Sequence, residues 1–206
     1  MSVCAIVQAR MSSRRFPGKV LAPFRHEPII VHVLRAVEAA VGPAAVIVAT
    51  STDPSDDCLD VFLAARGVRV VRGPLDNVLA RVQQAARSCD ADWILRISAD
   101  SPLLDAALLR RVVDRAGADC DLVTTIWPRT FPKGCNAELI RRSVLLSIDA
   151  SAVTAEEAEH VTPFFYHRAD RYRIRNVESG DATLANRSVA VDTPDDLERL
   201  ERVGDG

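Results

Sequence analysis

Short apolar runs alternate with longer amphipathic stretches along the first 125 residues of the chain. The apolar runs have strand length and are almost continuously hydrophobic, which predicts strands buried on both faces of a sheet. They cover residues 2–9, 44–50, 68–72, 92–98 and 120–125. The stretches between them carry apolar residues at helical spacing and predict helices over 28–40, 55–67, 77–89 and 105–118. This order predicts an α/β fold, a three-layer sandwich with a mostly parallel central sheet.

The pattern changes beyond residue 125. Turn-forming residues are frequent over 127–140, and the stretch 155–169 resembles a helix that is broken at Pro163. The last part of the chain predicts two more strands and a terminal helix, over 172–177, 187–193 and 194–203. We interpret 126–180 as a small β/α insert that supplies an acceptor wall or a dimer arm. The whole chain, 1–206, is then one domain.

The composition and net charge of the chain argue against nucleic acids and membranes as partners. The 206 residues are 48% hydrophobic, enough for a substantial core, and the net charge is −2. That charge and an aromatic content of 5% argue against nucleic-acid binding. No apolar run reaches membrane-spanning length, so we expect no membrane partner. The five cysteines form no CxxC pair and have no histidine at metal-ligand spacing, which fits a cytoplasmic protein without a zinc site.

Basic residues are almost all arginines. Of 26 lysines and arginines, only Lys19 and Lys133 are lysines, and they lie in the tripeptides PGK and PKG. A lysine ammonium is a compact point charge, whereas a guanidinium is a planar fork. The two lysines therefore mark two places where a point charge is of use.

The first predicted strand leads into an unusually basic loop. It contains Arg10, Ser13, Arg15, Gly18 and Lys19. Cationic side chains, a hydroxyl and backbone N–H groups near a glycine are the donors that a nucleoside triphosphate needs. The loop is not a Walker A motif, because GxxxxGK[ST] is absent. A solvated basic loop is the alternative interpretation.

Two aspartates follow predicted strands. Asp100 ends the strand over 92–98, and Asp192 follows the strand predicted over 187–193. Carboxylates at strand ends project into the crevice where ligands bind in parallel α/β sheets, and Mg²⁺ binds such carboxylates together with substrate phosphates. The alternatives are local: Asp100 as a turn cap before Ser-Pro, and Asp192 as a helix N-cap.

Five motifs in order give the chain a resemblance to a known family. ARMSSRRFPGK, RISADSPLLD, FPKG, EHVTP and VDTPDDL resemble those of the cytidylyltransferase family. That family includes the CMP-sialate and CMP-Kdo synthetases, and the spore-coat polysaccharide biosynthesis type is the most similar branch. The resemblance runs from Val3 to about Val203.

The resemblance implies a glycosyltransferase-A-like (nucleotide-diphospho-sugar transferase-like) fold and Mg²⁺-dependent transfer of CMP from CTP, with release of pyrophosphate. It implies nucleotide contacts for Arg10, Ser13, Arg15, Lys19, Arg72 and Arg81. It implies that Asp100 and Asp192 bind the metal, and that Lys19, Arg15 and Asp100 act in catalysis. It places Lys133, Asn136, Glu159 and His160 on the acceptor side.

The chain also departs from the family pattern. Asn136 stands where an acidic residue is usual, Ser101 where cysteine is frequent, and Arg14 where a small residue is usual. Because the segment around Asn136 is expected to line the acceptor pocket, the identity of the acceptor stays open. His160 and His167 are possible general bases, although a histidine in such a setting is more often packed or hydrogen-bonded.

The function predicted is therefore transfer of CMP from CTP to an acidic sugar or phosphonate, by a chain expected to form a homodimer as its family implies. Two alternatives stay open. One is a nucleotidyltransferase or glycosyltransferase of the same fold that uses another nucleotide. The other is a nucleotide-binding subunit without turnover.

Overall fold

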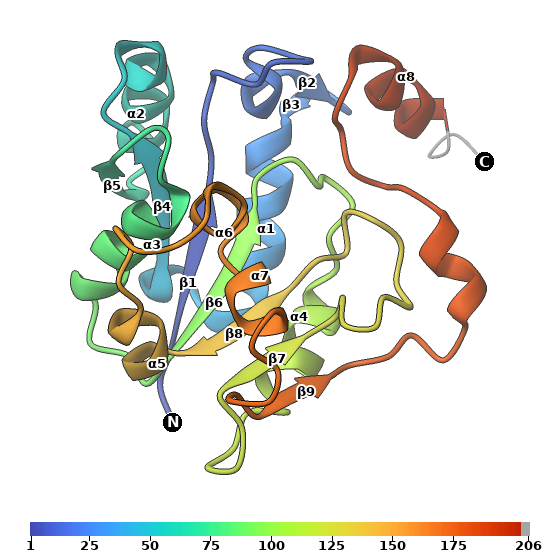
Figure 1. The fold of residues 1–206 in the computed structure, drawn as a ribbon. Coiled ribbons are helices and arrows are strands. Elements are labelled where there is room, and N and C mark those ends of the chain that lie inside the picture. The colour runs from blue at the N-terminus through green and yellow to red at the C-terminus, as the bar shows by residue number, and fades with distance from the viewer. Residues whose placement is uncertain (203–206) are drawn as a thin grey trace.

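A twisted seven-stranded sheet forms the centre of the computed structural model, which describes residues 1–202 (Figure 1). Its strands, in spatial order, are β5 (Arg69–Gly73), β4 (Val46–Ser51), β1 (Val3–Gln8), β6 (Trp93–Ser98), β8 (Glu138–Arg141), β7 (Leu122–Thr124) and β9 (Ile174–Asn176). Every neighbouring pair is parallel except the two pairs that β8 makes with β6 and β7. The prediction of a mostly parallel sheet is confirmed.

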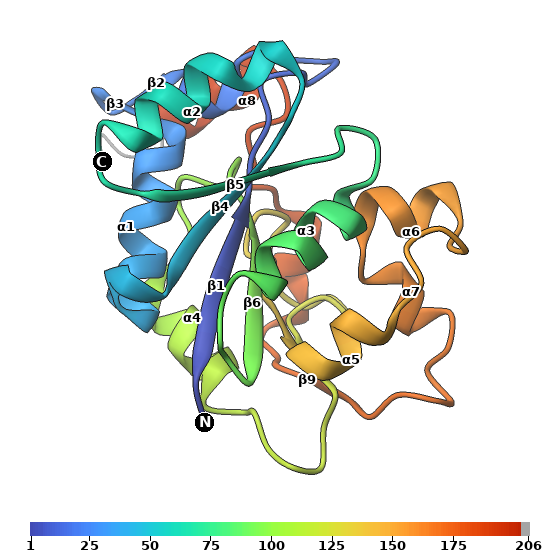
Figure 2. The same ribbon diagram turned by 90° about the vertical axis from the view of Figure 1, so that its left-hand side faces the viewer.

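Helices cover both faces of this sheet, so the fold has three layers (Figure 2). One layer contains α1 (Ile29–Val41), α2 (Asp57–Ala64) and α4 (Ala106–Val113). The other contains α3 (Val78–Arg87), α5 (Arg142–Ser147), α6 (Ala155–His160) and α7 (Pro163–Tyr166). Two buried hydrophobic clusters result, one on each face, because successive strand side chains point to opposite faces. None of the helices in the described part of the chain is long and apolar enough to span a membrane.

The five strands and four helices predicted over the first 125 residues are present in the predicted order, with shifted ends. The helix over 155–169 is interrupted before Pro163, as predicted, and gives α6 and α7. The terminal helix is α8 (Pro194–Arg202). It packs through Leu200 on a small apolar cluster beside the hairpin of β2 (Pro23–Phe24) and β3 (Glu27–Pro28), which lies near it in Figure 1.

Residues 126–180 contribute to the main sheet as well as to its surroundings. β8 and β9 come from this segment, and β8 is inserted between β6 and β7. The sequence analysis did not predict β8 or α5, because ELIR and RSVLLS are too short and too mixed to show a period.

The strand predicted over 187–193 is wrong. This segment crosses the carboxyl edge of the sheet, where it pairs with a loop and has no neighbouring strand. Val189 donates its N–H to the carbonyl of Lys133 (2.7 Å), and Lys133 donates its own to the carbonyl of Arg187 (2.9 Å). Val191 donates to the carbonyl of Asp100 (2.9 Å), so the segment connects two loops beside the sheet.

Gly134 makes this crossing possible. Its φ is +102°, and a Cβ built on it would lie 2.6 Å from the backbone nitrogen of Ala190. The PKG loop and the segment before Asp192 therefore lie backbone against backbone, closer than any residue with a side chain allows.

We expect Gly134→Ala to lower the melting temperature clearly more than Gly42→Ala. Both glycines have positive φ, so both variants carry backbone strain of about 1–3 kcal/mol. Only Gly134 has backbone within reach of the added methyl group, since nothing lies within 4 Å of that position at Gly42. Thermal unfolding measures both variants, and an equal loss in the two would contradict the close approach.

Candidate active site

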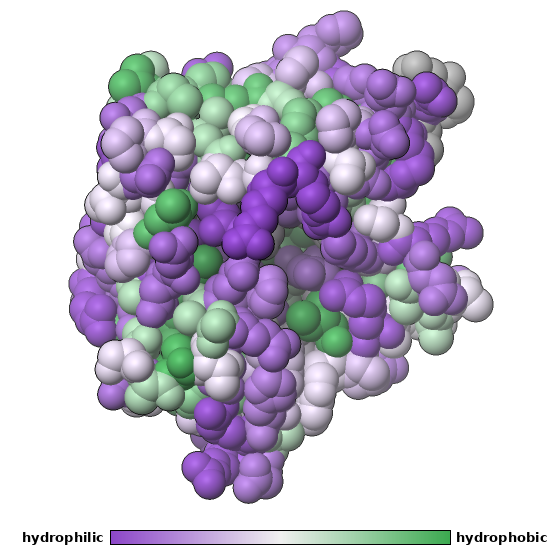
Figure 3. All heavy atoms as spheres, turned by 45° about the horizontal axis from the view of Figure 1, so that its top comes forward, coloured by the Kyte–Doolittle hydropathy of each residue, from purple (hydrophilic) through white to green (hydrophobic). Residues whose placement is uncertain are grey.

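A cleft of about 690 Å³ opens beside the carboxyl ends of β1 and β6, within the size range of small-molecule sites. Its lining comes from the basic loop after β1, from β6 and β8, from α6 and from the segment before α8. Figure 3 shows a hollow on this side of the molecule bordered mainly by hydrophilic residues. Ligands of parallel α/β sheets bind at this edge.

The charge of the cleft differs from that of the chain. Among the described residues that line it, seven are arginine or lysine and four are aspartate or glutamate. The chain as a whole carries a net charge of −2. A concave site with excess positive charge concentrates field lines and favours a polyanionic ligand.

The basic loop is held in place by a buried carboxylate that the sequence analysis did not single out. Asp56 is fully buried and accepts hydrogen bonds from the backbone N–H of Met11 (2.6 Å) and of Ser51 (2.9 Å). The loop then closes on itself, since Gly18, at φ +76°, donates its N–H to the carbonyl of Met11 (2.7 Å). The backbone of this loop is therefore anchored to the rest of the fold, while Arg14 and Arg15 on it are exposed to solvent.

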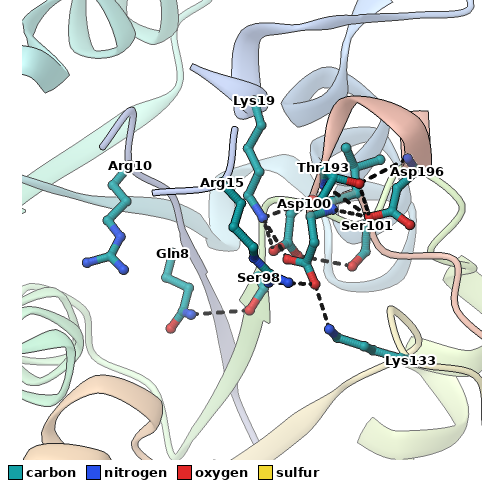
Figure 4. A network of polar contacts seen from close by, with 12 residues as sticks. Gln8, Arg10, Arg15, Lys19, Ser98, Asp100, Ser101, Lys133, Thr193 and Asp196 are labelled. Carbon is teal, nitrogen blue, oxygen red and sulfur yellow. Dashed lines mark hydrogen bonds and ion pairs between the residues drawn. The ribbon is translucent and has the colours of Figure 1, made fainter. Parts of the chain in front are cut away.

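Lys19 lies between the two predicted metal-binding acids. Its ammonium donates to Asp100 Oδ2 (2.8 Å), to Asp192 Oδ1 (3.2 Å) and to the carbonyl of Val191 (2.8 Å). Figure 4 shows the Lys19 side chain directed toward Asp100. The Lys19 side chain is only 11% exposed. Two carboxylates 92 positions apart in sequence thus share one buried ammonium, whose three N–H donors are all used.

Asp192 has two further cations beside it. Lys133 Nζ lies 2.5 Å and Arg15 Nη2 3.0 Å from Asp192 Oδ2. Burial alone would raise the pKa of Asp192, but the hydrogen bond from Lys133 and the charges of Lys19 and Lys133 outweigh it and lower the pKa to about 2. The carboxylate is therefore ionised at any physiological pH.

Neither acid caps the first turn of a helix, although Asp100 Oδ1 accepts a local hydrogen bond from the Ser101 hydroxyl (3.2 Å). The first turn of α8 is capped by Thr193 and Asp196: Asp196 Oδ2 accepts the N–H of Thr193 (3.0 Å), and Thr193 Oγ1 accepts that of Asp196 (3.3 Å). Helix α4 is capped by Asp105. Asp100 and Asp192 are left to face Lys19.

On the opposite wall, Arg10 forms an ion pair with Glu159 (3.2 Å) and so connects the basic loop to α6. In Figure 4 the Arg10 side chain lies apart from Lys19 and Asp100. After α6 the backbone turns at Val161, which has φ 68° and ψ −64° and is closed by the bond from the Thr162 N–H to the His160 carbonyl (2.8 Å). This is a strained γ-turn, rare for a β-branched residue.

The two histidines differ in position. His160 lines the cleft next to Glu159. His167 is not among the described lining residues; its side chain is 51% exposed, and its Nδ1 lies 3.2 Å from Oε1 of the buried Glu157. His167 is therefore an exposed, hydrogen-bonded residue outside the cleft, and of the two candidate general bases His160 is the one that can contact a ligand there.

Arg81 lines the cleft with a buried guanidinium, 2% exposed. Its Nη1 donates to the carbonyls of Pro74 (2.6 Å) and Leu75 (3.1 Å), while Nε has no partner among the described residues. Burial, with the nearby charge of Arg10, lowers the pKa of Arg81 to about 10. A buried, incompletely paired cation at the cleft edge is suited to an anionic or oxygen-rich ligand.

Arg72 lies elsewhere. It is absent from the described lining residues, and its guanidinium donates to the carbonyl of Ser51 (2.7 Å) and to Asp57 Oδ1 (2.7 Å). Its position at the outer edge of the sheet, on β5, supports a structural role, and we do not retain it among the proposed nucleotide contacts. Ser13, Lys133 and Asn136 do line the cleft, and Asn136 accepts a hydrogen bond from Arg129 (2.8 Å).

The structure also brings into the cleft residues that the sequence analysis missed, namely Gln8, Arg96, Glu138, Thr162 and Tyr166. Arg96 had a visible signal, because a charged residue inside the apolar run WILRIS must be paired or functional. Glu138 had none, since its strand was not predicted.

The acids present fit a hard divalent cation that also binds substrate phosphates. Within residues 1–202 no group of three or more His, Cys, Asp or Glu could enclose a metal ion. Two carboxylates at the mouth of a cationic cleft are the donor set that Mg²⁺ uses with nucleotides, whereas a metal bound by protein alone requires more ligands.

Fold and site together define an α/β nucleotidyltransferase. The sequence profile of the cytidylyltransferase family matches residues 4–203, so the chain belongs to that family. It is 29% identical over 205 residues to the spore coat polysaccharide biosynthesis protein SpsF of Bacillus subtilis, covering 95% of this chain and 83% of that protein. It is 27% identical to the 3-deoxy-manno-octulosonate cytidylyltransferase of Anaeromyxobacter dehalogenans, covering 96% and 95%.

Solved structures of similar proteins have the same fold as this chain. A cytidylyltransferase from Leptospira borgpetersenii has a TM-score of 0.91 at 27% identity, over 98% of this chain and 85% of that one. A CMP-2-keto-3-deoxy-manno-octonic acid synthetase solved with CTP has a TM-score of 0.75 at 19% identity, over 98% of each chain, and is similar in fold. The predicted resemblance and the predicted class of enzyme are both confirmed.

A buried ion pair joins α6 to the chain that follows α7. Glu157 has a side chain only 1% exposed and lies 2.5 Å from Arg168, whose hydrogen bond, outweighing burial, lowers the pKa of Glu157 from 4.5 to about 2. A carboxyl whose pKa is lower in the folded chain stabilises it above pH 4.5, and this stabilisation is lost as the pH falls toward 2.

We expect Glu157→Gln to reduce the acid sensitivity of the fold. Urea unfolding at pH 7 and pH 3 should show a smaller fall in the free energy of unfolding for this variant than for the wild type. Glu156→Gln is the matched control, because the neighbouring Glu156 side chain is 60% exposed. Equal pH dependence in all three proteins would contradict the assignment.

Proposed function

We propose that this chain transfers CMP from CTP to an acidic sugar or a phosphonate, with release of pyrophosphate. The observation that carries the proposal is the pair Asp100 and Asp192 around one buried lysine, in a cleft where cations outnumber acids. The names of the relatives support cytidine as the base and a sugar acid as one class of acceptor.

The cleft divides into two sides along the sheet. The basic loop after β1, together with Arg81 on α3, is the side we assign to CTP, with Arg10, Ser13, Arg15 and Lys19 as triphosphate contacts. The side over β6, β8 and α6 is assigned to the acceptor, with Lys133, Asn136, Glu159 and His160. Asp100 and Asp192 lie where the two sides meet.

In the proposed reaction an acceptor oxygen attacks the α-phosphorus of CTP. The new bond joins that oxygen to phosphorus, the bond to the bridging oxygen of the β-phosphate breaks, and pyrophosphate leaves with the electron pair. A hydroxyl acceptor loses its proton to solvent, whereas a phosphonate oxygen has none to lose. Because negative charge grows on the leaving group, positioned cations contribute most of the acceleration. In this proposal Lys19 and Arg15 have that task.

Asp100 and Asp192 are the residues that would hold Mg²⁺. When bound, the ion would neutralise phosphate oxygens and orient the triphosphate. The same oxygens are the partners of Lys19, so the ammonium and a divalent cation compete for them. In this proposal Lys19 moves from the acids to the phosphates when the metal nucleotide binds, a movement that suits a flexible side chain with a point charge.

The first experiment identifies the nucleotide. Among ATP, CTP, GTP and UTP with Mg²⁺, we expect CTP to raise the melting temperature most, because a ligand of the native state stabilises it by mass action. Pyrophosphate release with CTP is then measured across acidic sugars, alditol phosphates and phosphonates. Stabilisation by another nucleotide would favour the alternative nucleotidyltransferase. Stabilisation without release for any acceptor would favour the non-catalytic subunit.

The second experiment tests the competition at the acids. We expect Lys19→Met to bind Mn²⁺ in the absence of nucleotide at least about tenfold more tightly than the wild type. The substitution removes a positive charge whose repulsion of the ion at short range amounts to several kcal/mol. Electron paramagnetic resonance of free Mn²⁺ during titration measures this directly.

The matched control is Arg14→Met. Arg14 lines the same cleft and carries the same charge, but no ion pair is formed by it within the described chain. If Mn²⁺ affinity rose equally in both variants, the effect would be one of net charge alone. If Mn²⁺ affinity did not rise in Lys19→Met, the two acids would not be the metal site.

Homodimer formation stays a prediction, which light scattering tests.

A further inference from the structure

A row of polar side chains crosses three strands below the cleft, and two of its members, Arg96 and Glu138, line the cleft. Arg96 on β6 pairs in register with Glu138 on β8, which pairs with Thr124 on β7. One step deeper on the same face, the corresponding residues are Ile94, Ile140 and Leu122. The face of the sheet thus changes from apolar to polar within one two-residue step.

Stability of the fold does not explain this row. Arg96 is 7% exposed and Glu138 is 3% exposed, and they form a direct ion pair. Burying such a pair costs as much desolvation energy as the attraction returns, so apolar residues of similar size would serve the core equally well or better. The pair therefore needs another explanation than packing.

The hydrogen bonds of the pair leave groups free toward the cleft. Arg96 Nε donates to Gln8 Oε1 (3.0 Å) and Nη1 donates to Glu138 Oε2. Glu138 Oε1 accepts from Thr162 Oγ1 (2.6 Å). Arg96 Nη2 has no acceptor within the part of the chain that the structure describes, although Arg96 and Glu138 both line the cleft. Each carboxylate oxygen can also accept a second hydrogen bond.

The surroundings of the pair select the kind of group that fits. An unused N–H donor lies beside carboxylate lone pairs, and a hydroxyl, which both accepts and donates, satisfies the two together. A second anion would be repelled by Glu138. Tyr166 also lines the cleft, and its ring stacks on that of Trp127 with centroids 5.7 Å apart. The Tyr166 ring adds a flat apolar wall to the cleft.

From these observations we infer that Arg96 and Glu138 form a neutral, hydroxyl-binding subsite that reads the polyol part of the acceptor. This inference rests on the proposed function and adds the recognition element that its acceptor side lacks. Arg96 and Ser98 lie on one face of β6, and Asp100 follows in the turn two residues after the strand ends, so the subsite is at most about 13 Å along the chain from Asp100. The anionic group of the acceptor would lie at the cationic end, and its hydroxylated chain over Arg96.

The test uses two small probes on the full-length chain. D-arabinitol carries hydroxyls without an anionic group, and glycolate carries an anion with one hydroxyl. Saturation-transfer NMR titrations should give saturable binding of arabinitol to the wild type. We expect that binding to weaken at least about tenfold in the double variant Arg96→Met/Glu138→Leu, the loss for one or two hydrogen bonds to charged groups. Glycolate binding should be unchanged.

The double variant replaces both charges at once, so no buried charge is left alone and the melting temperature should be retained or raised. Arg96→Lys is a second variant: it keeps the charge next to Glu138 but removes the planar fork, and it should lose arabinitol binding as well. Stabilisation by CTP should persist in both variants. If CTP did not stabilise the wild type, the proposed function would be contradicted. The arabinitol titration would still test this inference separately.

Two results would overturn the inference. One is arabinitol binding to the wild type that does not saturate. The other is equal arabinitol binding by the wild type, the double variant and Arg96→Lys.

Discussion

The contact on which the site depends is that of Lys19 with Asp100 and Asp192. Two carboxylates cannot be held close together in a partly buried cleft unless a cation lies between them. Lys19 supplies that cation with all three of its N–H donors, and Lys133 and Arg15 compensate the remaining charge of Asp192. A guanidinium, with its fixed planar fork, would not fit the same three acceptors in this way. The two lysines of an otherwise arginine-rich chain both act at this point.

A different local feature of the structure positions each residue of this contact. Lys19 follows a loop tied to the buried carboxylate of Asp56 through Met11. Asp192 precedes a helix whose first turn is already capped by Thr193 and Asp196, so its own carboxylate is free. Lys133 is brought across by the close approach at Gly134. The site is thus rigid on three sides while the charged side chains themselves are long and adaptable.

The sheet explains how one cleft can serve two substrates. β8, inserted antiparallel between β6 and β7, carries Glu138 to a position beside Arg96. The strained turn at Val161 then brings Thr162 down onto Glu138 while Glu159 and His160 stay at the cleft wall. Strain of this kind persists only where surrounding contacts determine the conformation, and the hydrogen bond from Thr162 to Glu138 is one such contact here.

The sequence by itself determined the layered α/β architecture, because hydrophobic periodicity is a local property that burial on both faces of a parallel sheet imposes on each strand. It also pointed to the basic loop, to Asp100 and to Asp192 as residues carrying chemistry, and it identified the family.

Only the tertiary structure decided which of these residues meet. Arg72 and Arg81 look alike in sequence, yet the first binds Asp57 on the outer edge and the second lines the cleft. β8 is four residues long and shows no period, so neither its insertion into the sheet nor the pairing of Glu138 with Arg96 could be predicted. Such contacts depend on how distant strands are ordered in space, which no local pattern encodes.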